Sequence, residues 1–159
     1  MRKIFPVTAR AHRMLGVIKL IVEHSGSADI SVLSNETNED IDSLLPLIDA
    51  CRMLGLCIVK NGTVSIGDAA VTGSPKELNA HIAKRLRRIE PFRSVLAMLG
   101  NGKVLTTRQI ADRIERLGMV LYSPRAANEI GALKELLAGW AVHTKLLKHN
   151  AGNDSWSLA

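Results

Sequence analysis

Histidine and cysteine are the residue types of this 159-residue chain best suited to metal binding or nucleophilic chemistry, but their spacing argues against both roles. No two histidines stand four residues apart, as a metal site on a helix requires, and none has a cysteine or carboxylate at ligand spacing. His143 and His149 could approach each other across a hairpin, but separate packed or solvated side chains explain them better. Cys51 and Cys57 form no paired ligand motif and are expected to be buried free thiols. We therefore expect no metal site.

The segment LGNGKVLTT, residues 99–107, is the part of the chain most similar to a phosphate-binding loop. Such a loop joins a strand to a helix and ends in Lys followed by Ser or Thr, whereas Lys103 is followed here by Val104. The Gly-x-Ser-x-Gly turn that carries a hydrolase serine does not occur. The sequence therefore predicts no enzyme, no catalytic residue and no cofactor.

A cluster of basic residues is the clearest functional signal in the sequence. It consists of Lys84, Arg85, Arg87 and Arg88. On a helix these residues lie opposite an apolar stripe made by Ile82, Leu86 and Ile89. The basic side chains either contact phosphates, on nucleic acid or a membrane surface, or form a solvated face that pairs with nearby acids. The sequence leaves both interpretations open.

The first half of the chain has the pattern of a helix, a strand, two helices and a hairpin. Helices are predicted over 8–24, 31–34 and 41–53, with a bridge-like strand over 28–30. Pro46 is tolerated if the third helix begins at Asp42 or Ser43. Asn61-Gly62 supplies the positive φ angles of a two-residue hairpin turn. This order is that of a winged-helix domain, in which a β wing follows a helix-turn-helix.

The second half repeats this order after a helix over 74–89 that Ser74 caps. A further helix ends at Gly100, a short strand follows at 104–105, and the segment 106–109 has the sequence of a capping box. Ser123-Pro124 then begins a third helix, which we expect Gly139 to end. Strands over 140–147 and 155–158 would place Trp140 and Trp156 in one sheet.

These patterns predict a mainly α chain with small β wings, an α+β fold of two tandem winged-helix domains joined by a helix. The first domain is expected to span residues 1–72, the linking basic helix 73–90, and the second domain 91–159. The two halves differ in charge. Residues 1–72 carry seven Lys and Arg against eight Asp and Glu, and residues 73–159 carry fourteen against seven. Any polyanion should therefore bind the second half.

The third helix of each domain is the element that reads the DNA major groove in DNA-binding winged helices. In the first domain this helix and its start are acidic and repel phosphate, which favours a protein partner. The candidate docking residues are Glu39, Asp40, Asp42 and Asp49. In the second domain Arg125 and Asn128 could face a groove, although ordinary surface positions explain them as well.

The chain also resembles a known family, the AAA-associated C-terminal domain. The resemblance lies in GVIKLIVEHSGSADISVLS, in DIDSLLPLIDACRMLGL, in IAKRLRRIEPFRSVLAML and in the final hairpin, and it covers about Gly16 to Leu158. This domain usually follows the ATP-binding subunit of nitrate, sulfonate or bicarbonate-type ABC transporters. The resemblance implies an accessory, non-enzymatic module with a helix-turn-helix-like fold, whereas no ATPase domain precedes it in this sequence.

The expected function is therefore a non-enzymatic regulatory interaction module whose partner is a protein such as an ABC-type ATPase. The alternative is a winged-helix transcriptional regulator that binds double-stranded DNA through the basic second half. No apolar run approaches the roughly 20 residues of a transmembrane helix, and we expect a cytoplasmic protein. The helix over 8–24 has an apolar face wide enough to permit a homodimer formed through the first and last helices.

Overall fold

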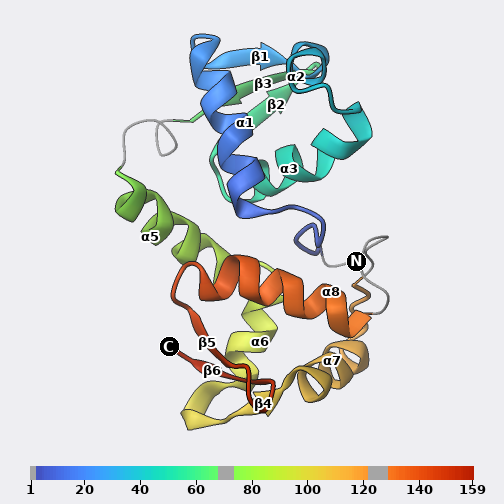
Figure 1. The fold of residues 1–159 in the computed structure, drawn as a ribbon, viewed down its shortest axis with the longest axis vertical. Coiled ribbons are helices and arrows are strands. Elements are labelled where there is room, and N and C mark those ends of the chain that lie inside the picture. Colours follow the sequence, from blue (N-terminus) through green and yellow to red (C-terminus); the bar gives the residue numbers. More distant parts are fainter. Residues whose placement is uncertain (1–2, 68–73, 122–128) are drawn as a thin grey trace. The chain divides into compact units, whose positions relative to one another are not determined.

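The computed structural model describes residues 3–67, 74–121 and 129–159, and these fall into two compact units (Figure 1). The N-terminal unit is Ala9–His81, and the C-terminal unit combines residues 3–8 with Ile82–Ala159. Each unit holds helices and one small antiparallel sheet. The expected mixture of helices and strands is confirmed.

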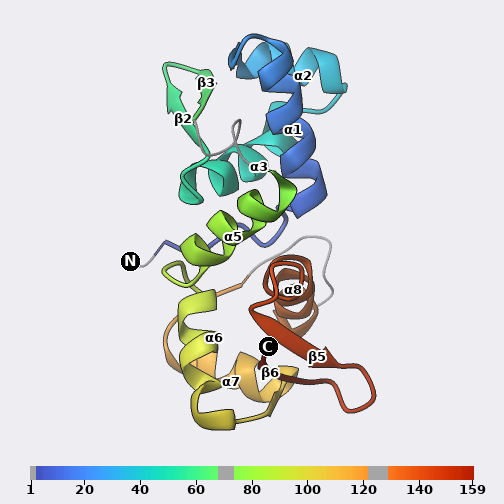
Figure 2. The same cartoon turned by 90° about the vertical axis from the view of Figure 1, so that its left-hand side faces the viewer.

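The N-terminal unit packs its helices against a sheet of three short strands. Its helices are α1 (Ala11–Glu23), α2 (Ile30–Thr37) and α3 (Ile41–Met53), and its strands are β1 (Ser27–Asp29), β2 (Cys57–Lys60) and β3 (Thr63–Ile66). The sheet order is β1-β3-β2 with antiparallel pairing throughout. Asn61 and Gly62 have φ angles of 52° and 79°, so the predicted two-residue hairpin turn is confirmed. Figure 2 shows this β2–β3 hairpin, whose strand β3 contacts α1.

The core of the N-terminal unit comes from one face of α1 and one face of α3. The fully or almost fully buried residues of these helices are Met14, Val17, Ile18, Ile21, Leu44, Leu47, Ile48, Ala50 and Cys51. The strand pair β1–β3 adds Ala28 opposite Val64, and both are buried. This inward face leaves the opposite side of α3 to the surface.

Helix α3 begins at Ile41, as the pattern over 41–53 predicts, so the later start at Asp42 or Ser43 that would place Pro46 in the first turn does not occur. Pro46 is the sixth residue of the helix and lies beyond the first turn. A proline at this position removes one backbone hydrogen bond. The burial of Leu44 and Leu47 on either side of it holds the helix together despite that loss.

The C-terminal unit begins within α5 (Pro75–Leu86) and contains a second set of helices with its own sheet. Its elements are α6 (Phe92–Met98), the 3-10 turn η1 (Gly100–Gly102), β4 (Leu105–Thr106), α7 (Thr107–Arg116), α8 (Glu129–Leu136), the π-helical η2 (Leu137–Val142), β5 (Leu147–Asn150) and β6 (Ser155–Leu158). The predicted capping box is confirmed, since the Thr106 hydroxyl accepts from the Gln109 amide at 3.2 Å while the Gln109 side chain accepts from the Thr106 amide at 2.9 Å.

The two units repeat one topology. The sheet order β4-β6-β5 matches β1-β3-β2 element by element. The buried pair Ala28–Val64 of the first sheet has its counterpart in Leu105–Trp156 of the second. Just after each hairpin, a backbone amide donates to the carbonyl of the residue that precedes the hairpin's first strand. Gly67 donates to Leu56 at 2.9 Å, and Ala159 donates to Leu146 at 3.2 Å.

Trp140 lies in a helical segment, so the prediction that it belongs to a strand is wrong. Gly139 does not end the helical stretch, because α8 is followed directly by the π-helical segment η2, which runs through Val142. Three residues after the end of this segment, Lys145 has a φ of 63°, which allows Leu146 to donate back to the Ala141 carbonyl at 2.8 Å. Trp140 is buried, with its ring centroid 4.8 Å from that of Phe5. This packing holds Trp140 on the inner face of the helical segment.

Phe5 anchors the first residues of the chain to the C-terminal unit. Its amide donates to the Glu90 carbonyl at 2.8 Å, and its ring packs edge-on against Phe92 as well as Trp140. Because residues 3–8 are taken up by this contact, α1 begins at Ala11 rather than at the predicted Thr8, and Arg10 stands at its N-cap position without a side-chain cap.

Candidate interaction surfaces

The outer face of α3 combines apolar and acidic side chains. Ile41 and Leu45 are one helical turn apart and stay 45% and 44% exposed although both are large and apolar. Asp42 is exposed beside them, and Asp49 lies half-buried on the same side of the helix. The inner face of α3 is buried against α1 and α2, so these four side chains form an outward surface, here called the α3 surface.

Of the four predicted docking residues, Glu39 is committed to a contact inside the unit. Its carboxylate forms an ion pair with Arg13 of α1, and its carbonyl accepts from Ser34 at 2.5 Å. Asp40 is exposed at the N-cap of α3, and its side chain makes no capping hydrogen bond. Asp40 and Asp42 therefore place negative charge at the start of the helix, where the helix dipole stabilises it.

The predicted basic residues lie at the surface of the C-terminal unit. Lys84 and Arg85 occupy the last turn of α5, and Arg87 and Arg88 follow it directly; all four are exposed. The predicted apolar stripe lies inward, with Ile82 and Leu86 buried and Ile89 half-buried. The helix thus keeps its basic side chains in solvent by burying the opposite side.

Two predicted contact residues, Arg125 and Asn128, lie outside the described residues. The described part of the neighbouring helix α8 exposes Glu129, Lys134 and Glu135. These exposed side chains carry both signs of charge.

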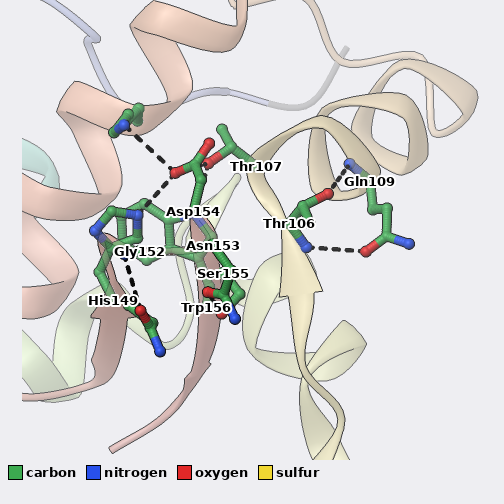
Figure 3. A network of polar contacts seen from close by, with 11 residues as sticks. Thr106, Thr107, Gln109, His149, Gly152, Asn153, Asp154, Ser155 and Trp156 are labelled. Carbon is green, nitrogen blue, oxygen red and sulfur yellow. Dashed lines mark hydrogen bonds and ion pairs between the residues drawn. The ribbon is translucent and has the colours of Figure 1, made fainter.

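A polar network joins the β5–β6 loop to the start of α7 (Figure 3). The Asp154 carboxylate accepts from the Thr107 hydroxyl at 2.9 Å and lies 2.8 Å from His149 Nε2, with Lys134 Nζ at 3.4 Å. Thr107 in turn accepts from the indole N–H of Trp156 at 2.8 Å. The hydrogen bond with His149, followed by those from Thr107 and Lys134, holds the pKa of Asp154 below its usual range.

The hydrogen bonds of this network fasten the β5–β6 loop to the start of α7. Thr107 is completely buried, and its hydroxyl is occupied on both sides by Asp154 and Trp156. His149 lies against the Trp156 ring, with the centroids 4.2 Å apart. Sequence reasoning missed the network because Thr107 and Asp154 are 47 positions apart. The one sequence signal was the capping box, which places Thr107 directly at a helix start.

The two cysteines are buried and free, as expected. The Cys57 thiol points at the Ile48 carbonyl, 3.8 Å away. The hydrogen bond with Cys57, together with burial, raises the pKa of the Cys51 thiol far above its ordinary value. Cys51 therefore stays a protonated, apolar part of the core.

Within residues 3–67, 74–121 and 129–159, no group of three His, Cys, Asp or Glu side chains is arranged to hold a metal ion. Over the same residues, no helix has the length and apolar character needed to cross a membrane.

Comparison with known proteins identifies the family of the chain. The family model of the C-terminal AAA-associated domain matches residues 31–150, which is most of the chain and confirms the resemblance drawn from the sequence. No curated protein and no solved structure shows significant similarity to the chain.

Proposed function

Because the chain belongs to the family of C-terminal AAA-associated domains, we propose that it is a non-enzymatic accessory module that binds an ATPase of the ABC-transporter type. Family membership supports an association with ATPases. The proposal places this association in the cytoplasm, where the two free thiols Cys51 and Cys57 would remain reduced.

The winged-helix assignment of both units forms part of this proposal. Each unit runs helix, strand, helix, helix, hairpin, and each sheet has its last strand in the middle. This is the order of a helix-turn-helix followed by a β wing. Winged helices can dock on proteins as well as on DNA, and the acidic start of α3 favours a protein for the N-terminal unit.

A purely binding role fits the use that the chain makes of its polar side chains. The hydrogen bonds of the polar cluster around Asp154 hold the β5–β6 loop to α7. Thr107, at the centre of this cluster, is fully buried, and its hydroxyl is bonded to both the Asp154 carboxylate and the Trp156 indole.

The observation that carries the proposal is the α3 surface in a chain of this family. Two large apolar side chains remain exposed on a helix whose other face is fully packed. Exposed apolar residues next to each other mark contact sites when they lie together on one face.

Binding to purified ATPase subunits tests the proposal directly. The chain would be titrated, by biolayer interferometry, against the ATP-binding subunits of nitrate, sulfonate and bicarbonate-type ABC transporters from the same genome. We expect micromolar or tighter binding to at least one subunit, and no ATP hydrolysis by the chain alone. Failure of every subunit to bind, with and without ATP, would exclude the proposed partner.

The alternative function is binding of double-stranded DNA through the basic residues 84–88. It is favoured by the exposure of Lys84, Arg85, Arg87 and Arg88 and by the positive balance of the second half. Phosphate-driven binding weakens steeply with salt. Anisotropy of labelled random-sequence duplex at about 50 and 200 mM salt measures this. Binding that collapses at the higher salt and is lost in Arg87→Glu/Arg88→Glu would favour the DNA function. No binding at low salt would eliminate it.

A further inference from the structure

The α3 surface has the arrangement of a helix that inserts its side chains into a partner. Ile41 and Leu45 stand four positions apart, which places both on one side of the helix and about one turn apart. This is the spacing with which amphipathic helices anchor in the apolar groove of another protein.

Packing fixes this surface before any partner arrives. Leu44, Leu47 and Ile48 are buried on the opposite side of α3 and hold its orientation, while Asn38, with a φ of 54°, sets the chain's turn into it. The Arg13–Glu39 ion pair ties the residue before Asp40 to α1. A rigid, pre-formed helix loses little conformational entropy on binding.

Charge decides what kind of groove fits. Asp40 and Asp42 are exposed beside Ile41 and Leu45, so a partner groove with acidic or neutral rims would either repel these carboxylates or desolvate them without compensation. Lys or Arg side chains on the rim would instead pair with them. Arg13 of the chain itself already forms an ion pair with Glu39. The cations that pair with Asp40 and Asp42 would therefore come from the partner.

We infer that α3 is the docking helix of this module, and that it inserts Ile41 and Leu45 into an apolar groove of the ATPase whose rim carries Lys or Arg near Asp40 and Asp42. This inference rests on the proposed function, because it names the surface through which the ATPase is bound. It assigns no role in docking to Glu39.

Matched surface variants of the full chain test the inference in the biolayer experiment with the ATPase subunits. The apolar variant is Ile41→Ser/Leu45→Ser, and the charge variant is Asp40→Lys/Asp42→Lys. The control is Leu117→Ser/Val120→Ser, which removes two apolar side chains that are 51% and 68% exposed in the C-terminal unit. Far-UV circular dichroism and urea unfolding establish that each variant remains folded.

We expect the apolar variant to weaken ATPase binding at least tenfold and the control to leave it within about twofold, since few residues dominate an interface. The charge variant should weaken binding and should also invert its salt dependence between about 50 and 300 mM, because salt screens the repulsion between the new lysines and a basic rim. Binding that is unchanged in both α3 variants would overturn the inference while leaving the proposed function intact. Binding by no ATPase subunit would overturn both together.

Discussion

The hydroxyl of Thr107, the first residue of α7, donates to the carboxylate of Asp154 at the far end of the β5–β6 loop, 2.9 Å away. A second bond joins the same residues, since the Thr107 amide donates to the Asp154 carbonyl at 3.2 Å. Asp154 has a φ of 50°, so the loop places its backbone in a left-handed conformation at this contact. The hairpin of the C-terminal unit is therefore fastened to a helix start by a side chain and by its backbone.

Asp154→Asn should destabilise the C-terminal unit at neutral pH, and the difference from the parent chain should shrink in acid. The folded-state pKa of Asp154 is lowered, so the carboxylate stabilises the fold above the unfolded pKa of about 3.9. That contribution is lost as the pH falls through the lower, folded pKa. Urea unfolding at pH 7 and near pH 3, followed by tryptophan fluorescence, measures the effect. An equal loss in the free energy of unfolding at both pH values would contradict this prediction. Both tryptophans, Trp140 and Trp156, lie in the C-terminal unit and report on it alone.

Thr107→Val should lower the free energy of unfolding of the C-terminal unit by about 1–3 kcal/mol, because it leaves the buried indole N–H of Trp156 without its acceptor. Thr107→Ser is the matched control: it keeps the hydroxyl and loses one methyl group, worth about 0.8 kcal/mol. Denaturant unfolding compares the two. A loss in the serine variant as large as in the valine variant would mean that packing, and not the hydrogen bonds, makes the contribution.

Lys145→Gly should stabilise the C-terminal unit by about 0.5–1 kcal/mol, since glycine adopts a positive φ without the steric cost of a Cβ. The equivalent helix end of the N-terminal unit already uses Gly55, with a φ of 70°. There Leu56 donates to the Cys51 carbonyl at 2.9 Å, as Leu146 does to Ala141. Gly55→Ala is the converse variant and should destabilise its unit. Thermal unfolding followed by circular dichroism checks both signs, and a destabilised Lys145→Gly would refute the argument.

Phe5→Ala should destabilise the C-terminal unit by about 3–5 kcal/mol, because a fully buried aromatic side chain is removed from between Phe92 and Trp140. Arg10→Ala, an exposed change just after the segment, is the control and should have little effect. Tryptophan fluorescence again provides the signal, since Trp140 borders the cavity. An unchanged midpoint for Phe5→Ala would show that the first residues do not stabilise this unit.

Local signals in the sequence were sufficient for the elements that local chemistry determines. Asn61-Gly62 predicted its hairpin turn, and Ser74 and the 106–109 segment predicted helix starts, because each depends on residues within three positions. The exposed basic face of α5 followed from periodicity alone.

The remaining features depend on contacts between distant residues, which periodicity does not contain. Glycine is a residue type that often follows the end of a helix, but the helical segment continues past Gly139 because Trp140 is buried against Phe5. The sequence predicted from its charge that Glu39 contacts a partner protein. In the structure the Glu39 carboxylate pairs instead with Arg13, which is 26 positions away in the chain. The exposure of Ile41 and Leu45 could not be predicted, since an apolar residue in a helix is by default assigned to the core.

Because Phe5 holds the first residues in the C-terminal unit, the two units do not follow one another simply along the chain. The backbone passes from one unit to the other twice, after Thr8 and after His81, so the N-terminal unit is an insertion within the C-terminal one. If the backbone is cut at one of these two junctions, the units remain covalently connected through the second junction. A protein fused ahead of Lys3 would accordingly be carried by the C-terminal unit, and not by the unit that comes next in the sequence.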